Sequence, residues 1–250
     1  MPTPARRLKS QYVRGARVLR TALGSAGVLG PVDRWAARSR TGLWARSLLS
    51  IWDVGELAEL DLPWWTFHSA ERVESFLVEH PGARVFEWGS GASTIWLARR
   101  SGSVVTVEHD VRFADAVRGL VPPGAMVDVR MIPLVEEPGA HPARPGPARP
   151  PIAGAGDGPA AWPYVSVIDE VGGTFDVIVI DGRARERCLV QAMPHLAVGG
   201  ILVFDNVEQR RYRDAIAALD PPVDVTWTCG LTPSMPYPTR TAILRQRGTA

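Results

Sequence analysis

The chain has 250 residues, of which 46% are hydrophobic, so it can bury one sizeable core, and we expect one principal domain with an appendage. Its formal net charge is +2, but residues 1–50 hold ten Arg or Lys and a single acid, Asp33. Because neither base-stacking aromatic residues nor a recognisable nucleic-acid module accompanies this charge, we expect no nucleic-acid partner.

The cysteine content and the lengths of the apolar runs indicate the cellular compartment in which the protein is expected. Cys188 and Cys229 are too few for a disulfide framework and favour a reducing environment. No apolar run reaches the roughly 18–20 residues that a bilayer span needs, and Arg14, Arg17 and Arg20 interrupt any signal-peptide apolar segment. The sequence predicts a cytoplasmic protein without a membrane span, and it does not indicate an oligomeric state.

Residues 1–62 are predicted to form a helical extension or cap. Apolar residues on one face indicate a basic amphipathic helix over 5–23, and a second apolar stretch predicts a helix over 44–60. The basic helix either packs over the rest of the protein or touches an anionic membrane surface. A further helix, with Ser69 as its N-cap, should end before Pro81.

From Arg84 onward the pattern changes to alternating strands and helices. Short runs of β-branched and aromatic residues indicate strands, and Pro122 and Pro133 end two of the elements. The predicted elements are strands over 85–88, 103–108 and 126–132, and helices around 95–97 and over 111–120.

Residues 136–163 interrupt this alternation. Pro, Gly and Ala make up 20 of these 28 residues, so the segment cannot bury enough apolar surface to offset its ordering entropy. We therefore expect a mobile insertion here.

The alternation then resumes and ends in two strands without a helix between them. The predicted elements are strands over 175–181 and 201–205, helices over 186–196 and 207–219, and strands over 223–228 and 241–245 joined by the loop 230–240. This order predicts an α/β fold with a Rossmann-like, seven-stranded, mostly parallel sheet, an antiparallel last strand and helices on both faces. Ligands bind such open sheets at the carboxyl ends of the strands.

The most informative segment surrounds Gly89 and Gly91, which allow a sharp turn and a close approach to a ligand. A dinucleotide-binding turn would carry a third glycine where this chain has Thr94. Glu87 precedes the turn, and a carboxylate there would repel a pyrophosphate but suit a ligand that carries an ammonium group. Glu108 ends the next strand, where a carboxylate can accept hydrogen bonds from both hydroxyls of a ribose.

Four segments resemble the class I S-adenosylmethionine-dependent methyltransferases. The run 87–94 (Glu-Trp-Gly-Ser-Gly-Ala-Ser-Thr) resembles their first motif, and 104–108 resembles the acidic strand that follows it. The runs 175–183 and 199–206 resemble the fourth and fifth strands, in variants similar to those of a bacterial branch. The resemblance covers about residues 63–246 and excludes the insertion, so we assign 63–250 to the methyltransferase domain.

The resemblance implies S-adenosylmethionine as cofactor and a small-molecule substrate. The implied cofactor residues are Glu87, Gly89, Ser90, Gly91, Ser93, Thr94, Glu108, His109 and Asp181. His109 either lies along the adenine edge or faces solvent. The alternative is that both glycines only make a tight turn, with the two glutamates as solvated strand ends.

The candidate catalytic residues are Asp181, Asp205 and Asn206, which follow neighbouring strands. This trio is similar to the metal-binding set of catechol-type O-methyltransferases, and its oxygen ligands suit Mg²⁺, although no metal site is assigned. The trio favours methylation at oxygen. Alternatively, Asp205 and Asn206 cap a helix beginning near Val207.

Arg183 and Arg185 follow Asp181 and can anchor an acidic substrate. Alternatively, Arg183 pairs with Asp181 or Glu186.

No Asn-Pro-Pro-Tyr-type segment, typical of amino-group methylation of nucleic acid, follows the fourth strand. Two further hypotheses are a nicotinamide-dependent oxidoreductase and a non-catalytic relative that binds a cofactor or a partner.

Overall fold

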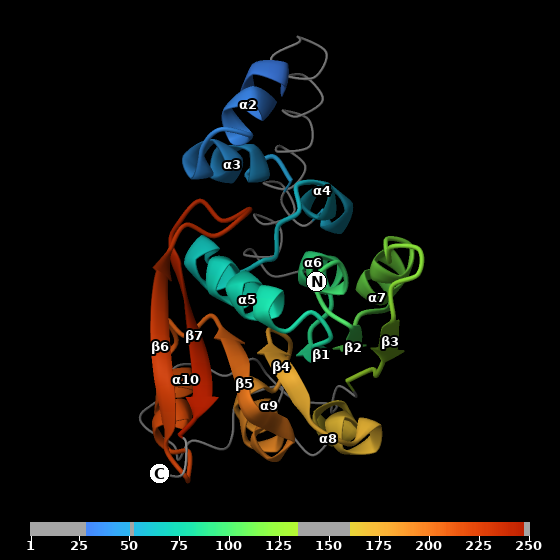
Figure 1. The fold of residues 1–250 in the computed structure, drawn as a ribbon, viewed down its shortest axis with the longest axis vertical. Coiled ribbons are helices and arrows are strands. Elements are labelled where there is room, and N and C mark those ends of the chain that lie inside the picture. Colours follow the sequence, from blue (N-terminus) through green and yellow to red (C-terminus); the bar gives the residue numbers. More distant parts are fainter. Residues whose placement is uncertain (1–28, 51–52, 135–160, 248–250) are drawn as a thin grey trace, which may run out of the picture.

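The computed structural model describes residues 29–50, 53–134 and 161–247. The strands in these ranges are β1 (Arg84–Trp88), β2 (Ser103–Glu108), β3 (Val127–Met131), β4 (Phe175–Ile180), β5 (Leu196–Asp205), β6 (Val223–Gly230) and β7 (Thr239–Gln246). They form a seven-stranded sheet of order β3-β2-β1-β4-β5-β7-β6. Strands β1 to β5 pair in parallel, whereas β7 is antiparallel to β5 and β6. The predicted sheet is confirmed (Figure 1).

Helices cover both faces of this sheet. They are α2 (Leu29–Ala36), α3 (Arg40–Ser47), α4 (Val54–Glu59), α5 (Phe67–Glu79), α6 (Ala92–Ala98), α7 (Val111–Arg118), α8 (Trp162–Val171), α9 (Arg185–Ala192) with a 3₁₀ turn, η2 (Met193–His195), and α10 (Arg210–Ala217). One core cluster joins α8, α9 and α10 to one face of the sheet, and another joins α5 and α6 to the opposite face. Figure 1 shows these two helical layers on either side of the strands.

Several predicted boundaries need correction. Thr66, and not Ser69, is the N-cap of α5, because its hydroxyl accepts a hydrogen bond from the Ser69 amide. The single helix predicted over 44–60 is two helices, α3 and α4, and Asp53 caps the second of them. Strand β5 begins at Leu196, five residues before the predicted start at 201. The strand continues through Gly199, which has a positive φ of 79° and lies beside a shift in the pairing register with β4.

Helix α8 was not predicted, and it begins inside the segment assigned to the insertion. Pro163 in its first turn is a typical helix start, and the apolar residues that follow pack against the sheet. The insertion therefore ends before Trp162. Residues 136–160, like the helix predicted over 5–23, lie outside the described residues.

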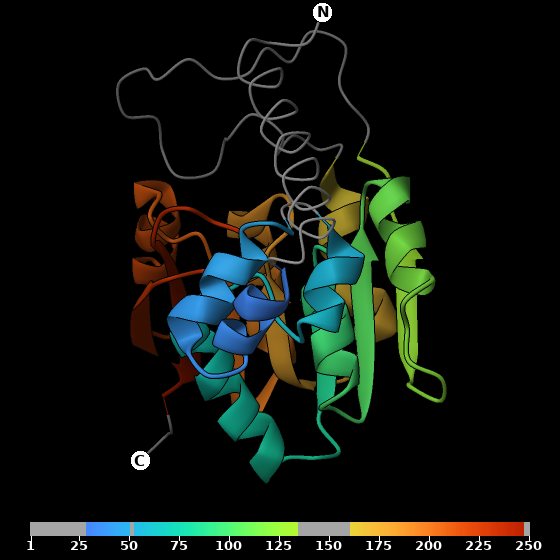
Figure 2. The same cartoon turned by 90° about the horizontal axis from the view of Figure 1, so that it is seen from above.

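The helices of the N-terminal extension pack on the α5–α6 side of the sheet. Val54, Leu57 and Ala58 of α4 share a core cluster with Ala92 and Ile95 of α6. Figure 2 shows α2, α3 and α4 gathered on this side. None of the helices in the described ranges is long and apolar enough to cross a bilayer.

Candidate active site

Strand alternation brings the four predicted acidic residues onto one face of the sheet. Side chains of a strand alternate between faces, so residues two or four positions apart share a face. Val85, Val104, Val179 and Val203 belong to the core on the α5–α6 face, and each lies two or four residues before an acid. Glu87, Glu108, Asp181 and Asp205 accordingly lie at the carboxyl ends of β1, β2, β4 and β5 on that side.

Glu87 is fully buried beneath the glycine turn. Its Oε1 accepts a hydrogen bond of 2.6 Å from Ser93 Oγ, and its Oε2 accepts hydrogen bonds from Thr94 Oγ1 and, at 2.8 Å, from Thr106 Oγ1. Burial raises the pKa of Glu87 to about 7, although these three hydrogen bonds oppose the shift. Three hydroxyl groups therefore enclose the carboxyl, and Ser93 and Thr94 direct their side chains to it.

Gly89 lies close to the backbone of Gly182, just after the end of β4. Its φ is 98°, and a Cβ added here would lie 2.6 Å from the backbone nitrogen of Gly182. Gly182 is in turn covered by Tyr164, whose hydroxyl would lie 2.0 Å from a Cβ at Gly182. The buried Tyr164 therefore fills the space beside Gly182 on this side. At Gly91 an added Cβ would meet only Trp64, at 3.8 Å.

Glu108 connects β2 to the glycine turn. Its Oε2 accepts hydrogen bonds from the amide and the hydroxyl of Ser90, at 3.0 and 3.2 Å. Its Oε1 accepts hydrogen bonds from the amides of His109 and Asp110, at 2.7 and 2.8 Å. Burial raises the pKa of Glu108, but the hydrogen bonds from His109 and Asp110 outweigh burial and hold the pKa below its ordinary value. The carboxylate is therefore charged at neutral pH and directed toward Ser90.

His109 links Glu108 to the loop after β4. Its Nδ1 lies 2.7 Å from Glu108 Oε1, and its Nε2 accepts a hydrogen bond of 3.3 Å from Arg183 Nε. Because the guanidinium only donates, the proton of a neutral His109 ring belongs on Nδ1, next to Glu108. The predicted pairing of Arg183 with Asp181 or Glu186 is not observed, since the guanidinium contacts His109 instead.

Asp181 pairs with Arg185, one turn further along the chain. Arg185 Nη2 donates to Asp181 Oδ1 at 2.8 Å, and the Asp181 side chain is 18% exposed. Burial raises the pKa of Asp181, while the charge of Arg185 opposes the shift, and the net pKa lies above its ordinary value. Asp181 is therefore a partly accessible carboxyl at the edge of the site that can accept a proton near neutral pH.

Asp205 is enclosed by its neighbours. Its two carboxyl oxygens accept hydrogen bonds of 2.6 Å from Thr241 Oγ1 and Asn206 Nδ2, and the residue is 1% exposed. Burial and the nearby charge of Asp181 raise the pKa of Asp205. The alternative that Asp205 and Asn206 cap the next helix is wrong, because α10 begins at Arg210 with Gln209 as its N-cap.

Tryptophans of the extension and of the segment that follows it reach this edge of the sheet. Trp64 lies against Gly91, whereas Trp65 is buried in the core beside Trp96. Trp44 Nε1 of α3 donates a hydrogen bond of 2.8 Å to the carbonyl of Met235, in the loop between β6 and β7. The extension therefore contacts this loop, and the segment between the extension and α5 contacts the glycine turn.

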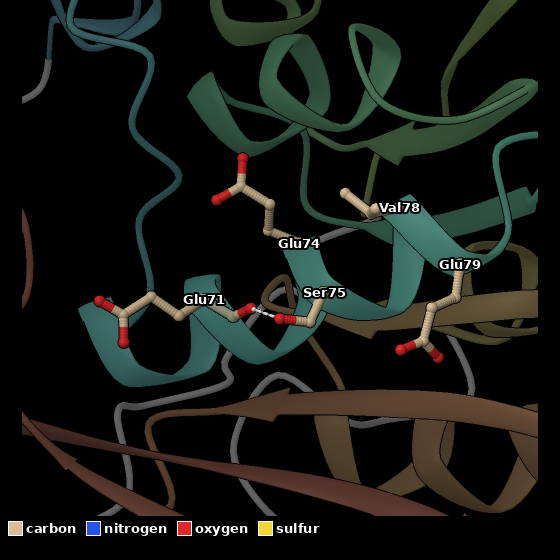
Figure 3. A pocket seen from close by; sticks show the side chains of 5 residues that line it. All are labelled: Glu71, Glu74, Ser75, Val78 and Glu79. Carbon is tan, nitrogen blue, oxygen red and sulfur yellow. Dashed lines mark hydrogen bonds between the residues drawn. The ribbon is translucent and has the colours of Figure 1, made fainter.

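A hollow on the outer face of α5 is separate from these residues. Figure 3 shows its lining, in which Glu71, Glu74 and Glu79 extend from one helix and Ser75 donates a hydrogen bond to the Glu71 carbonyl. None of the predicted site residues lines it. Two of its carboxylates pair with arginines, Glu71 with Arg40 and Glu74 with Arg100, at the surface of the helix.

Comparisons with known proteins identify the fold. No protein-family model and no curated protein matches the chain. Among solved structures, an O-methyltransferase from Bacillus cereus in complex with SAH matches 86% of this chain and 100% of its own, at 20% identity and a TM-score of 0.54. The chain has a class I methyltransferase fold.

Two further solved structures match with lower TM-scores. An rRNA methylase from Streptococcus thermophilus covers 71% of this chain and 96% of its own, at 14% identity and a TM-score of 0.48. A magnesium protoporphyrin IX methyltransferase from Synechocystis with bound SAM covers 72% of this chain and 79% of its own, at 13% identity and a TM-score of 0.46.

Sequence reasoning missed three residues of this methyltransferase-fold site. Thr106 donates a hydrogen bond to Glu87, and Thr241 donates one to Asp205. The sequence feature that could have indicated them is a polar residue within an apolar strand, on the face that carries the acids. Tyr164 packs over Gly182, and its signal was the helix start at Pro163. The structure therefore adds a supporting layer behind the predicted acids.

Proposed function

We propose that the protein is an S-adenosylmethionine-dependent methyltransferase that acts on a small-molecule acceptor, with oxygen as the methylated atom. The observation that carries this proposal is the antiparallel β7 inserted between β5 and β6. Dinucleotide-binding sheets instead have the order 3-2-1-4-5-6. The O-methyltransferase with the same fold was solved with SAH, which further supports a methyl donor over a nicotinamide cofactor.

The glycine turn and Glu108 are the proposed cofactor cradle. Ser90 and Gly91 form the turn, and Glu108 presents a charged carboxylate to it. A ribose would share this carboxylate with Ser90 Oγ and His109 Nδ1, since both now lie within 3.2 Å of its oxygens. Glu87 lies behind the turn and would act by holding Ser93 and Thr94 in place.

Asp181 is the proposed catalytic carboxylate. The cofactor supplies an electrophilic methyl group, and the protein has to align the acceptor for in-line attack and exclude water. Asp181 Oδ2 can accept the proton of an acceptor hydroxyl, while Arg185 holds Oδ1. Asp205 is enclosed, so we assign it and Asn206 to positioning this edge of the site.

Calorimetric titration with SAH and with NADH tests the proposed cofactor. We expect saturable binding of SAH and no response to NADH. The opposite pattern would replace the proposal with the oxidoreductase hypothesis. A methyl-transfer assay across phenols, carboxylic acids and sugars then tests catalysis, and complete inactivity with intact SAH binding would favour a non-catalytic relative.

Glu108→Gln should weaken SAH binding by about tenfold, the effect of losing a charge-assisted hydrogen bond of about 1.5 kcal/mol. Glutamine keeps one acceptor oxygen, but its NH₂ group then faces backbone amides that donated to the other oxygen, so we also expect a lower melting temperature, and SAH affinity is compared at a temperature where both proteins are folded. Glu79→Gln, an exposed change on α5, is the matched control and should keep wild-type affinity. Unchanged SAH affinity in Glu108→Gln would show that the ribose binds elsewhere.

A further inference from the structure

The acids at the ends of β4 and β5 belong to the set of residues whose oxygen atoms the sequence associates with Mg²⁺. Magnesium requires near-octahedral oxygen coordination and usually retains several waters. Both carboxyl oxygens of Asp205 already accept hydrogen bonds, from Thr241 and Asn206, and the residue is almost completely buried. Each oxygen keeps a second lone pair, but at 1% exposure Asp205 leaves little space for a metal ion that retains several waters.

A side-chain cation already lies between the two strand ends. Arg185 Nη2 donates to the Asp181 carbonyl at 2.7 Å as well as to its carboxylate, and Nη1 donates to the Asp205 carbonyl at 2.6 Å. Arg185 Nε donates to the Gly182 carbonyl at 3.0 Å. The residue is 9% exposed, so one guanidinium neutralises Asp181 and connects the ends of β4 and β5.

The backbone supports this placement of Arg185. Ala184, the residue before it, adopts a left-handed conformation with φ of 48° although it carries a side chain. Such a conformation persists only where the surroundings enforce it. Helix α9 starts directly after Ala184, so the unusual residue sets the direction in which Arg185 enters the site.

The described residues offer no alternative metal cluster. No group of three His, Cys, Asp or Glu side chains within 29–50, 53–134 and 161–247 is arranged to hold an ion. The charge balance at the edge is also unfavourable for a dication, because Arg185 already compensates Asp181. Asp181, Asp205 and Asn206 match the catechol-type set in residue type, but their contacts in the structure do not fit a metal site.

We propose that Arg185 serves as the fixed cation of this site in place of a metal ion, and that it is a positioning residue that orients Asp181 and holds the β4 end against the glycine turn. The role of Arg185 in orienting Asp181 for catalysis rests on the proposed function. The link from Arg185 to the glycine turn does not depend on that function, because Gly182 contacts both Arg185 and Gly89.

Manganese binding, followed by electron paramagnetic resonance with and without SAH, tests the absence of a metal at this site. We expect the wild type to show no saturable Mn²⁺ site that depends on Asp181, and its melting temperature to be the same in about 5 mM Mg²⁺ as in a chelator. A one-per-chain Mn²⁺ site that disappears in Asp181→Asn would overturn the proposal. A site that survives this substitution lies elsewhere and leaves the proposal standing.

Substitutions of Arg185 test the positioning role. Arg185→Met should weaken SAH binding by at least about tenfold, and Arg185→Lys should recover part of the loss, because lysine restores the charge but not the fork of donors. Arg210→Met, a change of the same type at an exposed position of α10, should keep wild-type affinity. Folded Arg185→Met with wild-type affinity would overturn the positioning role, and if Arg185→Met does not fold, affinity equal to wild type in Arg185→Lys would do so.

These readouts separate the two proposals. A wild-type protein that does not bind SAH contradicts the proposed function, whereas the Mn²⁺ titration of the unliganded protein still decides whether the acids hold a metal. Conversely, tight SAH binding together with an Asp181-dependent Mn²⁺ site would keep the methyltransferase assignment and remove the assigned role of Arg185.

Discussion

Gly89→Ala is expected to lower the free energy of unfolding by about 3 kcal/mol and to disrupt the candidate site. The residue has a φ of 98°, which disfavours any side chain, and an added Cβ would lie 2.6 Å from the nitrogen and 2.7 Å from the Cα of Gly182. Both obstructing atoms belong to the backbone, so no side-chain rotation relieves the overlap. Urea unfolding monitored by circular dichroism measures the loss.

Two glycines near Gly89, Gly91 and Gly182, provide a control and a second test. Gly91→Ala should cost less than about 1 kcal/mol, because its φ is 177° and the nearest atom to an added Cβ is a Trp64 ring carbon at 3.8 Å. Gly182→Ala should be severe, because its Cβ would overlap the Tyr164 hydroxyl, and Tyr164→Phe in the same chain should recover part of the loss. Equal stability of Gly89→Ala and Gly91→Ala would show that the turn and the β4 end are not in contact in solution.

The sheet could be predicted because each strand carries its own local signal. Strand β2 was predicted with its observed ends, 103–108, since four consecutive β-branched residues lead up to an acid that ends it. The final hairpin followed from two strands without a helix between them. Helix α8 was missed because the composition of 136–163 dominated the interpretation and hid the start of the helix at Pro163. Local composition is a weak guide where a segment adjoins a buried helix.

The location of the site was predictable, but the contacts of its side chains were not. The carboxyl ends of β1, β2, β4 and β5 follow from sheet topology, and the predicted acids lie there. Whether Asp181 pairs with Arg183 or Arg185 depends on the left-handed Ala184, and neither spacing nor residue type indicates that conformation. Tertiary geometry thus decided which arginine is buried.

From the sequence, Glu87 is expected to be a negative charge that faces a ligand, and the structure changes that interpretation. Its carboxyl has three hydroxyl partners and no exposed surface. Thr94, at the position of the third glycine of a dinucleotide-binding turn, is one of these partners and also accepts a hydrogen bond of 3.0 Å from the Gly91 amide. Glu87 and Thr94 therefore fix the shape of the turn together.

The burial of Glu87 predicts that the protein is more stable in mildly acidic than in neutral solution. Burial raises the pKa of the folded carboxyl to about 7 from an ordinary value of 4.5. Between these values the folded chain binds more protons than the unfolded chain, so the free energy of unfolding falls as pH rises. At 1.36 kcal/mol per pKa unit, Glu87 accounts for a fall of about 3 kcal/mol between pH 4.5 and 7.

Glu87→Gln should remove this contribution, because glutamine stays neutral and the three surrounding hydroxyls can donate to or accept from its amide. We expect a smaller decrease in the free energy of unfolding between pH 5 and 7 than in the wild type, measured by urea unfolding at each pH. Some decrease should remain, because burial also raises the pKa values of Asp181 and Asp205. Glu170→Gln, at an exposed position of α8, should retain the wild-type slope. If Glu87→Gln shows the wild-type slope as well, the carboxyl is charged throughout this range, and the turn then holds a buried anion that a bound ammonium group could neutralise.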